Sequence, residues 1–106
     1  MTQTAEEQQQ ATRIYNKVQF IGRIGKNPEQ KSEMAPVKFS LAVGQKDAPP
    51  MWLGVDCWEL LAKEVLANKS MYKGVLVEVQ GRLVTNVYNG KRYYNVVASS
   101  VEVIVL

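Results

Sequence analysis

Residues 75–97 read VLVEVQGRLVTNVYNGKRYYNVV, and this stretch decides the fold. The dipeptide Asn89-Gly90 lies between two runs of strand-forming residues, which is the strongest short signal for a type I′ hairpin turn. A two-residue loop there places Tyr88 opposite Lys91 and Asn86 opposite Tyr93. Because side chains alternate along a strand, one face of this hairpin then carries mostly polar and aromatic residues. They are Arg82, Asn86, Tyr88, Lys91 and Tyr93.

Outward from the hairpin, alternating apolar and polar residues predict three earlier strands. A helix is predicted only between the third and fourth strands, where Leu61 with Val65 and Ala62 with Leu66 form an apolar stripe. Three strands, a helix and two strands joined by a long hairpin is the order of the OB-fold, a five-stranded Greek-key barrel, so we expect an all-β protein. The expected strands are at about residues 17–24, 37–43, 51–58, 75–88 and 91–105, with the helix at 59–68.

Glycine and proline positions predict where the strands bend and stop. Gly22, inside the first strand, indicates a bulge or a sharp coiling point. Residues 26–36, which include two prolines, are expected to form a loop. Residues 45–50 are expected to connect two strands, because Pro49 and Pro50 do not continue a sheet.

Length and composition fit one soluble domain. The chain has 106 residues, of which 46% are hydrophobic and 22% charged. Residues 1–15 are polar and Gln-rich and are expected to form a flexible extension, which leaves residues 16–106 for the folded domain. The net charge is +3, and twelve basic against eight acidic residues follow residue 15. The basic excess therefore belongs to the folded part and permits a polyanionic partner without requiring one.

Residue types that carry catalysis and metal binding are scarce. The sequence has no histidine and one cysteine, Cys57, so an intramolecular disulfide, the usual zinc-ligand sets and the Ser-His or Cys-His pairs are all excluded. We expect a binding protein with no cofactor rather than an enzyme. No apolar run approaches the ~18 residues that cross a bilayer, and no signal-peptide pattern opens the chain. The expected location is the cytoplasm, at the nucleoid.

Several short motifs, taken in order and spacing, resemble those of bacterial single-stranded DNA-binding proteins. Residues 16–22 read NKVQFIG, followed by Asn27-Pro28-Glu29. Further matching segments are VKFSLA at 37–42, Trp52 and Trp58, LLAK at 60–63, VEVQGRL at 77–83 and the hairpin ending in Tyr93. The resemblance covers nearly everything after residue 15. It implies an OB-fold that binds single-stranded DNA without sequence preference and protects it in replication, recombination and repair.

Two arguments agree on the aromatic part of the site. Alternation turns Trp52 and Trp58 away from the core, and the hairpin register does the same for Tyr88 and Tyr93. The resemblance implies base stacking at Trp52, Trp58 and Tyr88, whereas Tyr94 falls on the core face and is left outside the site. The alternative is that these aromatics are ordinary barrel residues and the cations a solvated surface. The basic residues expected to follow the phosphates are Lys17, Arg23, Lys38, Arg82, Lys91 and Arg92.

Partners follow from the same resemblance. It implies a homo-oligomer, with a tetramer favoured over a dimer, and Ile21, Ile104 and Leu106 are apolar residues that a monomer would expose. The sequence stops at Leu106 without the acidic tail through which family members recruit enzymes, so we do not expect tail-mediated recruitment. The alternative function is a tailless OB-fold interaction module of the primosome type, which bridges replication proteins. Two strand-three tryptophans favour direct binding of DNA.

Overall fold

The hairpin predicted around Asn89-Gly90 is present in the computed structural model, which describes residues 15–105. β4 (Leu76–Tyr88) and β5 (Lys91–Val103) pair antiparallel, with Tyr88 opposite Lys91 and Asn86 opposite Tyr93. Asn89 has φ 51° and Gly90 φ 75°, as a type I′ turn requires. The predicted turn and its register are confirmed. The expected extension falls mostly on residues 1–14, which lie outside the described part of the chain, as does Leu106.

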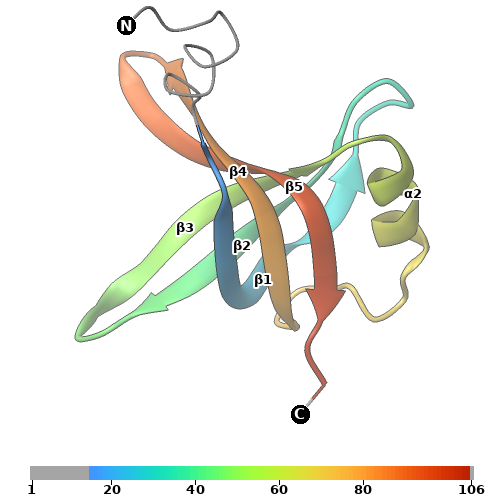
Figure 1. Cartoon of the computed structure of the whole chain (residues 1–106), viewed down its shortest axis with the longest axis horizontal. Coiled ribbons are helices and arrows are strands. Elements are labelled where there is room, and N and C mark those ends of the chain that lie inside the picture. The colour runs from blue at the N-terminus through green and yellow to red at the C-terminus, as the bar shows by residue number, and fades with distance from the viewer. Residues whose placement is uncertain (1–14, 106) are drawn as a thin grey trace, which may run out of the picture.

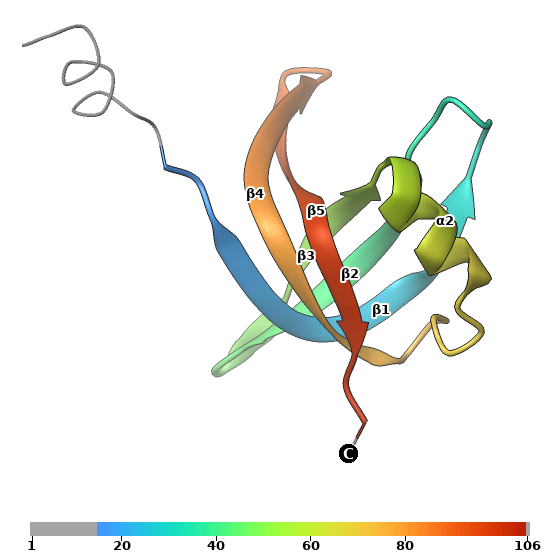
Figure 2. The same cartoon turned by 45° about the vertical axis from the view of Figure 1, so that its right-hand side comes forward.

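The strands close into a barrel in the order β1-β2-β3-β5-β4 (Figures 1 and 2). The short helix α2 (Glu59–Ala67) lies between β3 and β4 in the chain. Closure is made by a parallel pairing of β3 with β5, from Gly54 opposite Asn95 to Asp56 opposite Val97. This is the predicted all-β OB-fold. Before the helix come β1 (Val18–Gln30), β2 (Val37–Gln45) and β3 (Ala48–Cys57).

The core consists of the inward-facing side chains of all five strands, and the helix covers one end of it. Within α2, Ala62 and Val65 are buried against the barrel. Leu66, which the sequence pattern assigned to the same stripe, is 48% exposed, so that assignment was wrong. A helix of nine residues buries only a narrow stripe, and Leu66 lies at its solvent side. The side chains fully buried in the barrel are Ile24, Val37, Leu41, Val55, Cys57, Val77, Val79 and Val96.

The two segments expected to be loops are loops only in part: residues 31–36 and 46–47 lie between strands, and the rest belongs to strands. β1 continues through Pro28 to Gln30, and β3 begins at Ala48, before Pro49 and Pro50. In both places the register shifts, between Lys26 and Glu29 in β1 and opposite Gly44 in the β2–β3 pair. A bulge leaves a residue out of the hydrogen-bonded ladder, so a proline without an N–H fits there. The prolines bend these strands without ending them.

The coiling of β1 is shared between two glycines. At Gly22 the strand is still paired with β4, opposite Val77, and from Arg23 it also pairs with β2. A Cβ on Gly22 would overlap the carbonyl of Ala42, so the close crossing of the two strands requires glycine. The bulge itself lies at Gly25, three residues after the position predicted for it, between Ile24 and Lys26.

Candidate nucleic-acid interface

Four exposed aromatic side chains gather where the β2–β3 and β4–β5 hairpins diverge. The ends of these hairpins spread apart on the side of the barrel away from α2 (Figure 1). Trp52 is 58% exposed on β3, and Tyr88 is 69% exposed at the end of β4. Tyr93 and Tyr94 of β5 are each nearly half exposed. They line a hollow of about 500 Å³, the hairpin groove, together with Ser40, Leu53, Gly54, Asn86 and Asn95.

Trp52 is held at the base of the hairpin groove by two small residues. The position of a Cβ on Gly25 is already filled by the six-membered ring of the Trp52 indole and by the hydroxyl of Ser40, 2.8 Å away. β1 and β2 therefore support one side of the indole, while more than half of the residue stays accessible. A large, flat ring with a solvent-exposed surface is suited to stacking on an unpaired base.

The floor of the hairpin groove is polar. Gly54 pairs with Asn95 across the parallel β3–β5 contact, and a Cβ on Gly54 would lie 2.7 Å from the Asn95 Oδ1 atom. The Asn95 carboxamide therefore occupies the space above Gly54, with Asn86 on the neighbouring strand lining the same hollow. Carboxamides donate and accept hydrogen bonds, so this floor can contact any base edge.

Tyr94 was assigned to the core from its parity, and this assignment was wrong. The residue lies opposite Thr85 in the inward series of β5, but it is 48% exposed and lines the hairpin groove with Tyr93. Tyr94 comes before Asn95, the first residue of β5 that pairs with β3, so at Tyr94 the inward face of the hairpin is not yet covered by the barrel. Parity along a strand identifies the face but not where the core ends.

The cations of the hairpin lie beside the aromatic rings. The Lys91 Nζ atom sits 5.7 Å from the centre of the Tyr93 ring, within range of a cation–π contact. Arg92 is exposed and lies opposite Val87, on the other face of the hairpin from Lys91. Lys91 is thus adjacent to a stacking position, and Arg92 is at the hairpin end without lining the groove.

Trp58 lies apart from the hairpin groove. It follows β3 as the N-cap residue of α2 and is 47% exposed. It lines a separate hollow of about 690 Å³ between the β1–β2 connection and the helix, with Met34, Ala62 and Leu66. Six residues of extended chain separate it from Trp52, which is roughly 20 Å. Trp52 lies within β3, whereas Trp58 follows the end of this strand, and each tryptophan lines its own hollow.

Between the two tryptophans, an ion pair with Lys38 neutralises Asp56, the one acidic residue of β3. The Lys38 Nζ atom donates to the Asp56 Oδ1 atom at 3.0 Å, across the β2–β3 pair. The Asp56 side chain is only 13% exposed, whereas that of Lys38 is 53% exposed. Lys38 therefore cancels the charge of Asp56 while its ammonium group remains accessible.

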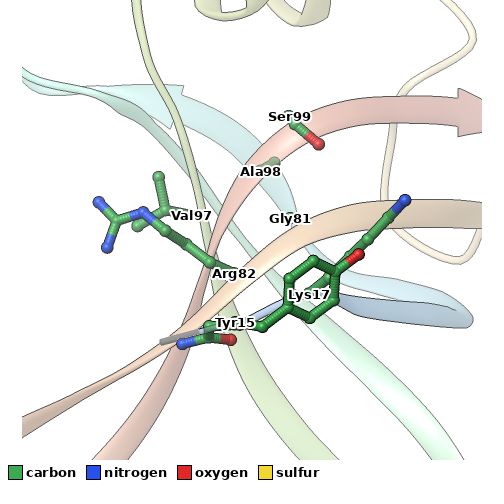
Figure 3. Close-up of a pocket in the computed structure, with 8 residues that line it drawn as sticks. Tyr15, Lys17, Gly81, Arg82, Val97, Ala98 and Ser99 are labelled. Atoms are coloured by element: carbon green, nitrogen blue, oxygen red, sulfur yellow. The ribbon is translucent and has the colours of Figure 1, made fainter. Parts of the chain in front are cut away.

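The other predicted basic residues lie elsewhere. Arg23 donates from Nη1 to the Gly74 carbonyl at 2.9 Å, which ties β1 to the segment before β4, far from the hairpin end. Lys17 and Arg82 line a third hollow on the outer face of β1 and β4 (Figure 3). The structure therefore brings Trp52, Tyr88 and Tyr93 together, places Lys91 beside them, and leaves Trp58, Arg23, Lys17 and Arg82 outside the hairpin groove.

Cys57 is the last residue of β3 and is fully buried. Burial first, and the negative charge of Asp56 second, raise the pKa of its thiol to about 12. A thiol in this environment is protonated at neutral pH and unsuited to nucleophilic chemistry.

Among residues 15–105, no group of three or more His, Cys, Asp or Glu side chains is placed to hold a metal ion. Within the same residues, no helix is long and apolar enough to span a bilayer.

The barrel and its row of exposed aromatic rings define an OB-fold binding module. The model of the single-strand binding protein family matches residues 15–106, and the chain belongs to this family. The second single-stranded DNA-binding protein of Mycobacterium smegmatis superposes with a TM-score of 0.70 at 29% identity, over 85% of this chain and 89% of that one.

Two further structures share the fold. A deletion mutant of the single-stranded DNA-binding protein of Thermus aquaticus has a TM-score of 0.69 at 25% identity and covers 87% of this chain and 42% of that one. The dimeric N-terminal domain of PriB from Thermoanaerobacter tencongensis has a TM-score of 0.65 at 20% identity, and the match covers 86% of this chain and 98% of that one. A search of curated proteins finds no significant match.

Proposed function

We propose that this protein binds single-stranded DNA without sequence preference and protects it during replication, recombination and repair. The observation that carries the proposal is the hairpin groove, in which Trp52, Tyr88, Tyr93 and Tyr94 are exposed around one hollow. Family membership and the likeness to the Mycobacterium smegmatis protein support it. Binding to chromosomal single strands would keep the protein in the cytoplasm at the nucleoid.

Base stacking supplies the sequence-independent part of the binding. Every base has a π-face, and each stacked base contributes roughly 1 to 3 kcal/mol. The rings of Trp52 and Tyr88 accept bases that are already unstacked, whereas the bases of a duplex present only their edges. Asn86 and Asn95 then satisfy the polar edges of whichever base is stacked. Single strands are therefore preferred over duplex.

The cations supply the salt-dependent part. Lys91 lies next to the Tyr93 ring, and Lys38 and Arg92 are exposed. Trp58, which follows β3 and lines a separate hollow, is proposed as a second stacking position for the same DNA strand. The logarithm of the affinity is expected to fall with the logarithm of the salt concentration, by roughly 0.7 per phosphate neutralised on a single strand.

The test is a titration of intrinsic tryptophan fluorescence with poly(dT) at low and high salt, beside a duplex of equal length. The expected result is strong quenching by poly(dT), weaker quenching at high salt, and little quenching by duplex. Unchanged emission from folded protein at low salt would refute the proposal. It would favour the alternative, an interaction module of the primosome type, in which the exposed rings contact a protein.

We also propose that the protein is a homo-oligomer, a tetramer in preference to a dimer. β1 pairs with β2 only from Arg23 onward, so within the described residues the second edge of Val18–Ile21 has no strand partner. Ile21 on this segment is 51% exposed. An open strand edge with an exposed apolar residue is a ready surface for a second copy. Light scattering tests this: a mass near that of one 11.9 kDa chain would contradict it.

A further inference from the structure

The hollow that holds Lys17 and Arg82 also contains an aromatic residue that the motifs do not include. It measures about 620 Å³ and lies on the outer face of β1, β4 and β5. Tyr15 stands beside it with 82% of its surface exposed, the largest exposure of any described tyrosine. In Figure 3 the Tyr15 ring lies between the two cations, with the Lys17 chain extending to one side and the Arg82 guanidinium to the other.

Tyr15 is anchored although it precedes the first strand. β1 pairs with β4 from Val18 opposite Gly81, and the side chain of Asn16, two residues before Val18, extends this contact. The Asn16 Nδ2 atom donates to the Leu83 carbonyl at 2.7 Å, and the Leu83 N–H donates to the Asn16 Oδ1 atom at 2.9 Å. These two side-chain hydrogen bonds take the place of a backbone pair between β1 and β4 and fix the chain at Asn16. Its neighbours Tyr15 and Lys17 therefore both lie over β4.

The floor of the hollow is made by small residues at an irregular point of the β4–β5 pair. The register shifts between Gln80 and Gly81, which leaves Ser99 as the extra residue on β5. A Cβ on Gly81 would overlap the Val97 carbonyl, so this close approach of the strands requires glycine. The bulge and the missing side chain leave an open floor beneath the Tyr15 ring.

The charges of the hollow suit an anion. Neither Lys17 nor Arg82 forms an ion pair with any carboxylate of residues 15–105. An exposed ring with a cation on each side is the arrangement that takes a base on the ring and the flanking phosphates on the cations. The side chains of this hollow therefore fit a nucleotide within a nucleic-acid strand better than an isolated phosphate, which would not contact the Tyr15 ring.

The hollow is also in line with the hairpin groove. Arg82 and Asn86 lie on the same face of β4, and four residues of extended strand separate them by roughly 13 Å. Asn86 and Tyr88 line the hairpin groove. A DNA strand that leaves the hairpin groove along the outer face of β4 therefore reaches Tyr15 next.

We propose that Tyr15, Lys17 and Arg82 form an additional nucleotide subsite, in which Tyr15 stacks on one base of a single strand that continues from the hairpin groove. This inference rests on the proposed function and extends the path of the DNA. Oligonucleotides long enough to leave the groove gain the extra contacts, and shorter ones do not.

The test compares Tyr15→Ala and Tyr15→Phe with the parent protein, using oligo(dT) of about 4 to about 16 nucleotides, the range of site sizes known for OB-folds. Tyr72→Ala is the matched control, because Tyr72 is 56% exposed and lines neither hollow. For the longest oligonucleotides, Tyr15→Ala is expected to weaken binding roughly five-fold to a hundred-fold, the range for one lost stacked base. Tyr15→Phe, which keeps the ring, and Tyr72→Ala are expected to bind as the parent does.

A direct readout uses oligonucleotides that carry 5-iodouracil, with mass spectrometry of the photo-crosslinked peptides. The expected result is a crosslink at Tyr15 with long oligonucleotides and none with short ones. Parent-like binding of Tyr15→Ala at every length, without a crosslink, would overturn the subsite. A lower mass of DNA-free Tyr15→Ala in light scattering would also overturn it and assign the hollow to contact between copies. Failure of the proposed function looks different, because poly(dT) would then not quench Trp52 in the parent protein.

Discussion

The six-membered ring of the Trp52 indole lies directly over the backbone of Gly25, so the bulge in β1 determines where the tryptophan of the hairpin groove rests. The two residues are far apart in the sequence and on strands that do not pair. Their contact links the coiling of the barrel to the geometry of binding, because the same irregularity that bends β1 makes room for the indole.

Gly25→Ala is therefore expected to weaken binding of oligo(dT) by at least roughly five-fold, the lower end of the range for one stacked base. The added Cβ occupies the place of the indole ring and forces Trp52 to move. Binding is measured by fluorescence titration and folding by circular dichroism. Gly44→Ala is the matched control, because nothing lies within 4 Å of a Cβ at that position. Equal affinity of both variants would show that the position of the indole does not matter.

Asp56→Asn is expected to tighten binding at low salt. The substitution removes the negative charge from the face between Trp52 and Trp58 and releases Lys38 from its 3.0 Å ion pair. If Lys38 then contacts a phosphate, the slope of log affinity against log salt becomes steeper by roughly 0.7. Glu102→Gln is the control, because it removes one exposed carboxylate at the far end of β5, opposite Glu78 on β4 and away from Lys38. An unchanged slope would mean that Lys38 does not contact the strand.

Tyr94→Ala separates the two interpretations of that residue. A core tyrosine lost to alanine would cost several kcal/mol of stability, roughly 3 to 5 by analogy with large aromatic residues. Because Tyr94 is 48% exposed in the hairpin groove, the expected result is a small change in thermal stability and a clear loss of affinity for oligo(dT). Large destabilisation would return Tyr94 to the core.

Tyr94 also illustrates what the sequence could and could not show. Asn89-Gly90 was enough for the turn and the register of the hairpin, and alternation correctly turned Trp52 and Tyr88 outward, because both are local properties of a strand. The end of the core is a property of the closed barrel, since it depends on where β5 separates from β3 near Asn95. The groove floor at Gly54 is likewise formed by strands that meet only on closure.

The prolines show the same limit from another side. Pro28, Pro49 and Pro50 were interpreted as ends of strands because a proline cannot donate to a ladder. Each lies at a register shift, and a shift is specified by pairs of strands rather than by one segment. Tyr15 had no signal at all, because its place depends on the contact of Asn16 with Leu83, 67 residues away.

Cys57 is expected to resist thiol reagents at pH 8 while the protein is folded and to react at once in denaturant. Its pKa is raised from 9.0 to about 12, so the folded state favours the neutral thiol. The stability that this contributes is complete below about pH 9 and is lost as the pH rises towards about 12. The difference in unfolding free energy between the parent and Cys57→Val should therefore shrink over that range. Rapid labelling of native protein would contradict the burial.

Trp52 and Trp58 are expected to act as independent stacking positions on one strand. Six residues of extended chain place them roughly 20 Å apart, and they line different hollows, so no shared contact couples them. Each substitution by alanine should cost roughly 1 to 3 kcal/mol of binding free energy to a long oligonucleotide. The double variant should show the sum of the two costs within about 0.5 kcal/mol, as distant sites do. Substitution by phenylalanine, which keeps a ring, is the control at each position.

An oligonucleotide that fills only the hairpin groove adds a sharper discrimination. It should lose affinity on Trp52→Ala and be indifferent to Trp58→Ala, because the second hollow is out of its reach. If Trp58→Ala leaves binding unchanged at every length, Trp58 is not part of the DNA path, and its exposed ring beside Met34 and Leu66 belongs to the surface of α2. If the two costs fall well short of additivity on long strands, the DNA contacts one tryptophan at a time.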